Sequence, residues 1–165
     1  MFDHEMRDAA ERVLVACRKR GFKVVTAESC TGGLVAATLT AIAGSSDVVD
    51  RAFVTYANEA KREMLGVSWD ALLGHGAVSD PVARAMAAGA LARSGADLAV
   101  SVTGVAGPGG GSADKPVGLV HFAAALRDGT TICDAKHFGD IGRAQVRHKS
   151  VLQALQMLRE LASQR

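Results

Sequence analysis

The chain has 165 residues, of which 48% are hydrophobic and 22% charged, and this composition fits one globular domain with a real core. The net charge of +2, without a long basic run, gives no electrostatic basis for direct binding to nucleic acid. No apolar run reaches the ~18 residues of a membrane span, and the N-terminus lacks the apolar segment of a signal peptide. We therefore expect a cytoplasmic protein without membrane contact.

Cysteine and histidine patterns also exclude some classes of site. The cysteines Cys17, Cys30 and Cys133 are odd in number and lack CxxC spacing, which indicates reduced thiols. The five histidines show no HExxH motif or paired-ligand spacing, so we expect no metal site.

The first part of the chain alternates helical and β-branched segments. In chain order, the patterns predict a helix from Met6 to about Gly21, a buried strand over 22–27, a helix over 34–42, a strand over 50–56, and a helix over 58–65 with Asn58 as candidate N-cap.

The second part predicts further helices and a hairpin. The patterns predict a helical turn over 69–73, a long helix opened by Asp80-Pro81, a strand over 97–103, a glycine-rich loop over 104–115, a hairpin of 117–126 and 130–138 across Asp128-Gly129, and a C-terminal helix around residues 151–162. This order predicts a single layered α/β/α domain with a mixed β-sheet over residues 1–165.

The first candidate site is the polar corner between the strand over 22–27 and the helix over 34–42. Glu28, Ser29 and Cys30 crowd into it, Thr31 is a candidate N-cap, and Gly32-Gly33 would let a ligand approach the backbone. A helix N-terminus favours an anion such as phosphate or carboxylate. A structural turn whose polar residues only cap the helix explains the corner equally well, and a buried structural thiol explains Cys30 better than a nucleophile does.

The second candidate site combines Ser45-Ser46 with Tyr56 and Lys61. A serine hydroxyl needs a base, and a lysine desolvated in a pocket can act as one because burial lowers its pKa. Tyr56 could relay a proton or hold a substrate. Taken alone, the segment fits better with a surface lysine and an ordinary pair of loop serines.

The third candidate site is the glycine-rich segment 102–112, which follows an apolar strand. Ligands of open α/β sheets bind at the carboxyl ends of strands, and Thr103 with the glycines could bind an anion there. The segment is neither a Walker A loop nor a GxGxxG motif, and a flexible loop entering the hairpin is the equal alternative. Arg143 and Arg147, four residues apart on one helix face, are further anion-binding candidates or parts of a solvated face.

Together these segments resemble the CinA C-terminal domain family, the nicotinamide-nucleotide amidases of the PncC type. The matching motifs, in family order from about residue 5 to residue 160, are Thr26-Ala-Glu-Ser-Cys-Thr-Gly-Gly33, Gly44-Ser-Ser46, Val54-Thr-Tyr-Ala-Asn-Glu-Ala-Lys61, Val102-Thr-Gly-Val-Ala-Gly-Pro108 and the region from Gly139 to Arg143. Longer members carry an additional N-terminal domain resembling molybdopterin-binding proteins, which we do not expect here. Many relatives place the arginine directly after the aspartate, whereas this chain reads Gly139-Asp-Ile-Gly-Arg143.

The resemblance implies hydrolysis of nicotinamide mononucleotide to nicotinate mononucleotide and ammonia, in pyridine nucleotide salvage, without cofactor or metal. It implies Ser46 as nucleophile and Lys61 as general base, with Tyr56 and Ser29 beside them and Ser29 as the alternative nucleophile. The residues expected to bind the nucleotide are Thr31, Gly32, Gly33, Thr103, Gly104 and Arg143. It also implies a homodimer or higher homo-oligomer. The competing hypotheses are a non-catalytic nucleotide-binding module and an interaction protein linked to competence or DNA damage.

Overall fold

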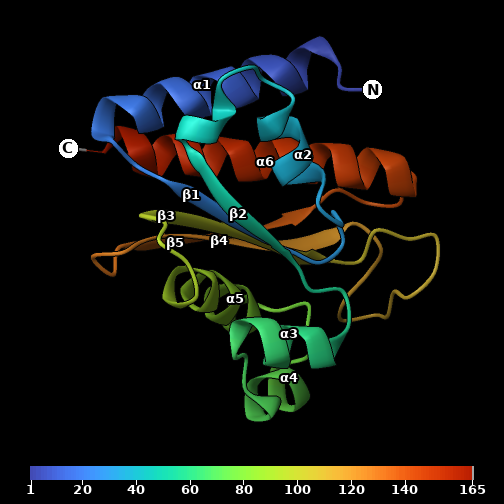
Figure 1. Cartoon of the computed structure of the whole chain (residues 1–165). Helices are drawn as coiled ribbons and strands as arrows, with labels where there is room; N and C mark the ends of the chain where they lie inside the picture. The colour runs from blue at the N-terminus through green and yellow to red at the C-terminus, as the bar shows by residue number, and fades with distance from the viewer. Residues whose placement is uncertain (165) are drawn as a thin grey trace.

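The computed structural model describes residues 1–164, which fold around one five-stranded mixed sheet with the strand order β2-β1-β3-β4-β5 (Figure 1). The strands are β1 (Val24–Glu28), β2 (Val49–Val54), β3 (Leu98–Gly104), β4 (Leu119–Leu126) and β5 (Thr131–His137). Strands β2 and β3 are parallel to β1, whereas β4 and β5 are each antiparallel to the preceding strand. The expected mixed sheet is confirmed.

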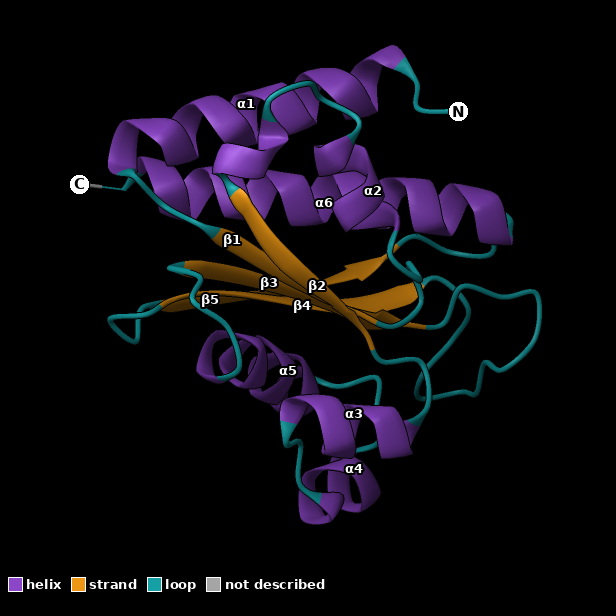
Figure 2. Cartoon of the chain, in the orientation of Figure 1, coloured by secondary structure: helices purple, strands orange, loops and turns teal. Residues whose placement is uncertain are grey.

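Helices cover both faces of the sheet (Figure 2). One layer contains α1 (His4–Arg20), α2 (Leu34–Thr40) and α6 (Arg143–Ser163), and the other contains α3 (Asn58–Leu65), α4 (Trp69–His75) and α5 (Asp80–Ala92). Alternate residues of a strand point to opposite faces, so Val24 packs with the first layer and Val25 with the second. None of the helices described for residues 1–164 is both long enough and apolar enough to cross a bilayer.

The predicted elements agree with the structure in order and type, but two caps were predicted wrongly. Helix α2 begins after Gly33, which has a positive φ of 96° and makes no side-chain cap, so Thr31 is not its N-cap. Helix α3 is preceded by Ala57 as N-cap, so Asn58 is its first residue. In both places the sequence offered a polar residue within two positions of the true boundary, and element boundaries depend on backbone geometry that residue type does not fix.

The strand directions bring several chain segments to one edge of the sheet. Strands β1, β2 and β3 are parallel and all end there, and β5, which runs in the same direction, delivers the start of α6 to the same edge (Figure 1). From this edge the chain leaves β1 for α2 in one helical layer and leaves β2 for α3 in the other. Such a switch between neighbouring strands opens a crevice at the carboxyl edge.

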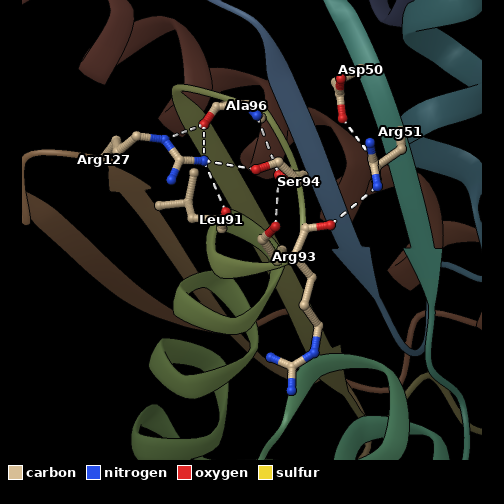
Figure 3. A network of polar contacts seen from close by, with 8 residues as sticks. Asp50, Arg51, Leu91, Arg93, Ser94, Ala96 and Arg127 are labelled. Atoms are coloured by element: carbon tan, nitrogen blue, oxygen red, sulfur yellow. Dashed lines mark hydrogen bonds and ion pairs between the residues drawn. The ribbon is translucent and has the colours of Figure 1, made fainter.

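The opposite edge of the sheet is closed by main-chain contacts of Arg127 (Figure 3). The Arg127 guanidinium donates from Nε to the carbonyl of Ala96 at 2.8 Å, and from Nη2 to the carbonyls of Leu91 at 2.8 Å and Ser94 at 3.0 Å. These carbonyls follow or end α5, and buried or half-buried carbonyls require such partners. These contacts fix the connection from α5 to β3.

Helix α3 lies unusually close to α5 at Gly89. A Cβ atom at position 89 would lie 1.9 Å from the carbonyl oxygen of Leu65, the last residue of α3. Only glycine permits this approach. The position of α3 relative to the sheet is therefore fixed by backbone packing.

Candidate active site

A cavity of about 220 Å³ opens at the carboxyl edge of β1, β2 and β3. Its polar side chains come from four different segments of the chain and are Ser29, Tyr56, Asn58, Lys61, Thr103 and Arg143. A larger groove of about 920 Å³ between α1 and α6 is lined by exposed charged side chains such as Arg12 and Arg159. The smaller cavity is the candidate site because buried polar groups converge in it.

Lys61 is the buried amine of this cavity, with only 1% of its surface exposed. Its Nζ lies 3.0 Å from Ser29 Oγ, 2.9 Å from the carbonyl oxygen of Thr55 and 3.0 Å from that of Tyr56. Burial lowers the pKa of Lys61 because it penalises the ammonium form. The two carbonyl oxygens can only accept, so each of them takes one N–H hydrogen of Lys61. The third substituent position of the nitrogen then faces the Ser29 hydroxyl. In the neutral amine that position holds the lone pair.

Ser29 is held in place by the main chain at the end of β1. Its side chain is buried, and its amide donates to the carbonyl of Val102 on β3 at 2.9 Å. The neighbouring carbonyl of Glu28 accepts from the amide of Thr55 at 2.9 Å, which ties the same corner to the end of β2. The serine and the backbone that positions the lysine are thus parts of one hydrogen-bonded edge.

The anion site expected at the start of α2 is already filled by the Glu28 carboxylate. This fully buried side chain accepts from the amides of Val35 at 2.9 Å and Ala36 at 3.1 Å. The hydroxyls of Thr26 and Thr31 donate to it at 3.0 Å and 2.7 Å. Each of its two oxygens has one amide and one hydroxyl as partners. The helix N-terminus therefore has an internal anion.

The expected pairing of Ser46 with Lys61 is not formed. Ser46 is exposed in a 3₁₀ turn directly before β2, whereas Lys61 follows the end of β2. A strand of six residues spans about 20 Å, so the two residues belong to opposite edges of the sheet. Lys61 contacts Ser29 instead, although Ser29 is more distant in sequence.

The residues expected to bind the nucleotide divide into two groups. Thr103, Gly104 and Arg143 line the cavity, and Arg143 Nη2 donates to the Tyr56 hydroxyl at 3.0 Å while Nη1 donates to the carbonyl of Gly107 at 2.8 Å. Thr31, Gly32 and Gly33 lie in the corner behind Ser29 and are not among the residues that line the cavity. The Thr31 carbonyl accepts from Arg147 Nη2 at 3.1 Å, which anchors the corner to α6.

Cys30 lines the same cavity but has the environment of a structural thiol. Its side chain is buried, and this burial raises the pKa of the thiol to about 11. Because the thiolate is the reactive form, Cys30 is a poor nucleophile near neutral pH. Among residues 1–164, no three His, Cys, Asp or Glu side chains are grouped as a metal site would require.

Two residues of this region had no functional role in the sequence analysis. Asn58 was considered only as a cap, and it lines the cavity on the same helix as Lys61. Glu28 was considered only as part of the corner, and it is the buried anion of α2. The i, i+3 spacing of Asn58 and Lys61 could have indicated a shared helix face. No sequence signal indicates that Glu28 binds the amides of α2.

The fold and the site define an α/β protein with a buried serine–lysine pair at the carboxyl edge of a mixed sheet. The family model described as the CinA C-terminal domain matches residues 6–162, and the chain belongs to this family.

Proteins of several bacteria are similar to this chain. It is 52% identical over 159 residues to the nicotinamide-nucleotide amidohydrolase PncC of Escherichia coli strain K12, a match that covers 96% of this chain and 95% of that one. A CinA-like protein of Mycolicibacterium gilvum is 51% identical over 90% of this chain but only 35% of its own length. The crystal structure of a competence/damage inducible protein from Agrobacterium tumefaciens superimposes with a TM-score of 0.96 at 53% identity, and the match covers 99% of both chains.

Proposed function

We propose that this protein is a nicotinamide-nucleotide amidohydrolase that converts nicotinamide mononucleotide and water to nicotinate mononucleotide and ammonia. The observation that carries the proposal is the 3.0 Å contact between the buried Lys61 Nζ and Ser29 Oγ inside the cavity. Amide hydrolysis requires an activated nucleophile, and a lysine with a lowered pKa can activate a serine. The 52% identity to a relative named for this activity supports the substrate.

In the proposed first half-reaction, Ser29 Oγ attacks the carboxamide carbon while its proton passes to the neutral Lys61 amine. The resulting tetrahedral intermediate carries negative charge on the former carbonyl oxygen. The Lys61 ammonium then gives this proton to the leaving nitrogen, the C–N bond breaks, and ammonia departs. An ester between Ser29 and the nicotinoyl group remains. The carbonyls of Thr55 and Tyr56 keep the lysine nitrogen aimed at the serine in both protonation states.

In the second half-reaction, water replaces ammonia beside Lys61. Lys61 takes a proton from the water as its oxygen attacks the ester carbon, and the same proton returns to Ser29 Oγ as the ester C–O bond breaks. The product is nicotinate mononucleotide, which ionises in water. The chain's own residues supply nucleophile and base, so we infer that the route needs neither metal nor cofactor.

The 5′-phosphate of the substrate is assigned to the side of the cavity lined by Arg143. An arginine guanidinium suits the recognition of phosphate oxygens, and the glycine-rich loop beside it offers backbone amides. The contacts of Arg143 with Gly107 and Tyr56 hold the guanidinium at the mouth of the cavity. The start of α2 is not assigned to the phosphate because Glu28 occupies it.

We also infer a cytoplasmic setting and a homodimer or higher homo-oligomer. The family resemblance supports the assembly. Cys17, Cys30 and Cys133 are free thiols, which fits a reducing compartment.

The proposal is tested by ammonia release from nicotinamide mononucleotide with EDTA present, comparing wild type with Ser29→Ala and Ser46→Ala. We expect release by wild type and by Ser46→Ala, and a loss of at least about 1,000-fold in Ser29→Ala. Mass spectrometry of quenched wild-type enzyme should find the nicotinoyl mononucleotide ester on Ser29. Binding of the nucleotide without any release would instead identify a non-catalytic module. Full activity in Ser29→Ala would exclude the proposed nucleophile.

A further inference from the structure

Asn58 is a polar residue of the cavity that has no role in the proposed serine–lysine mechanism. It is the first residue of α3 and lies three positions before Lys61, so both side chains share one face of the helix. Asn58 is half-buried and lines the cavity together with Ser29. Asn58 therefore borders the cavity in which the proposed reaction takes place.

The other polar side chains of the cavity each form at least one hydrogen bond within the chain. Lys61 contacts Ser29, Thr103 Oγ1 donates to the carbonyl of Ala77 at 2.9 Å, and the Tyr56 hydroxyl accepts from Arg143. By contrast, the hydrogen bonds found among residues 1–164 leave the side-chain amide of Asn58 unused. Its two N–H donors and its carbonyl acceptor are available to a ligand.

A capping role does not explain the asparagine. The N-cap of α3 is Ala57, and Asn58 already has a helical position. Asparagine is a weaker helix former than alanine inside a helix. Helix stability alone would therefore favour a different residue at this position.

The proposed reaction needs a hydrogen-bond donor for the oxyanion. The carboxamide oxygen becomes negatively charged in the tetrahedral intermediate, and a donor aimed at it accelerates the reaction. In many serine hydrolases the amide of the nucleophile itself contributes such a bond. Here the Ser29 amide donates to the carbonyl of Val102, so it is not free for that purpose. A side-chain donor that lines the cavity can supply this bond.

We propose that Asn58 Nδ2 donates a hydrogen bond to the carboxamide oxygen of the substrate and is a catalytic residue that stabilises the oxyanion. This inference rests on the proposed amidohydrolase function. It adds a third catalytic side chain, from the same helix as the base, to the serine and the lysine.

The test compares the steady-state kinetics of wild type, Asn58→Ala and Asn58→Asp in the ammonia assay. Alanine removes the donor and favours the helix, whereas aspartate keeps the shape, removes the donor and suits a helix N-terminus. Glu59→Gln is the matched control because Glu59 is exposed in the same first turn. We expect kcat to fall about 100- to 1,000-fold in both Asn58 variants, with KM within about threefold of wild type and an unchanged Tm. The control should keep wild-type kcat.

The pH profile separates this role from an effect on the base. Asn58→Ala should lower the rate equally across the profile and leave the inflection of Lys61 in place, because Lys61 keeps its own contacts. A kcat within about twofold of wild type in either Asn58 variant would overturn the proposal, as would a loss expressed mainly in KM, which indicates ground-state binding. An inactive wild type would instead overturn the amidohydrolase function itself, and the inference with it.

Discussion

Ser29 and Ser46 each lie next to a lysine, but in opposite chemical settings. Lys61 Nζ lies 3.0 Å from the hydroxyl of Ser29, and both side chains are buried. Lys23 Nζ lies 3.4 Å from the carbonyl oxygen of Ser46, in contact with solvent. Only the first lysine is desolvated, and only the first touches the oxygen that would attack a substrate. A serine–lysine pair is defined by burial and by the atom that is contacted, not by proximity alone.

Among the tests of this comparison, we expect the largest change in kcat from replacing each of the two lysines in turn. Lys61→Ala should lower kcat by about 1,000-fold or more because the base and the proton donor for ammonia are both lost. Lys23→Ala should leave kcat near wild type. Ammonia release by the two purified variants measures this difference. Comparable losses in the two would erase the distinction between the two serines.

Glu28 and Asp47 offer the second comparison, because one carboxylate lies in each of the two regions. Glu28→Gln keeps the shape but directs amide hydrogens toward groups that are themselves donors, so we expect a loss of about 3 kcal/mol in the free energy of unfolding. Asp47 forms an exposed ion pair with Arg18 at 2.7 Å, and Asp47→Asn should change the free energy of unfolding little. Urea unfolding of both variants tests this. Equal midpoints for Glu28→Gln and wild type would refute the role of the buried anion.

The smallest effect is the pH dependence of Lys61. The lowered pKa means that the rate should rise with pH, about tenfold per unit below that pKa, and level off above it. Stability should also rise with pH between the folded and the unfolded pKa of the lysine, because the unfolded state binds more protons in this window. Lys61→Met should abolish this rise in stability while Lys23→Met keeps it. A flat rate profile from pH 6 to about 9 would count against lysine as base.

Local sequence signals predicted the fold well and the site only partly. The helix that ends near Gly21 and the hairpin across Asp128-Gly129 were predicted correctly because their glycines and spacing act locally. The edge at which three strands end was also predictable from strand direction. The choice between Ser29 and Ser46 could not be predicted, because it depends on whether each serine lies at the same end of β2 as Lys61.

The sequence also could not show how the corner at Ser29 satisfies its own charges. Thr31 was expected to cap α2, but its hydroxyl donates to Glu28, whose carboxylate caps the helix from the preceding strand. Such a bond depends on three-dimensional placement and has no periodic signature. The sequence likewise could not show that Asn58 lines the cavity while its neighbours form hydrogen bonds within the chain.

The close contact at Gly89 has a consequence for how this enzyme tolerates mutation. Lys61 is on α3, and α3 is set against α5 where a Cβ at position 89 would meet the Leu65 carbonyl. A single added methyl group there must push α3 away, and the lysine nitrogen moves with its helix. Position 89 does not line the cavity, yet it influences the distance between Lys61 Nζ and Ser29 Oγ. We therefore expect a genetic screen for loss of activity to find substitutions at Gly89, although this residue lies outside the cavity.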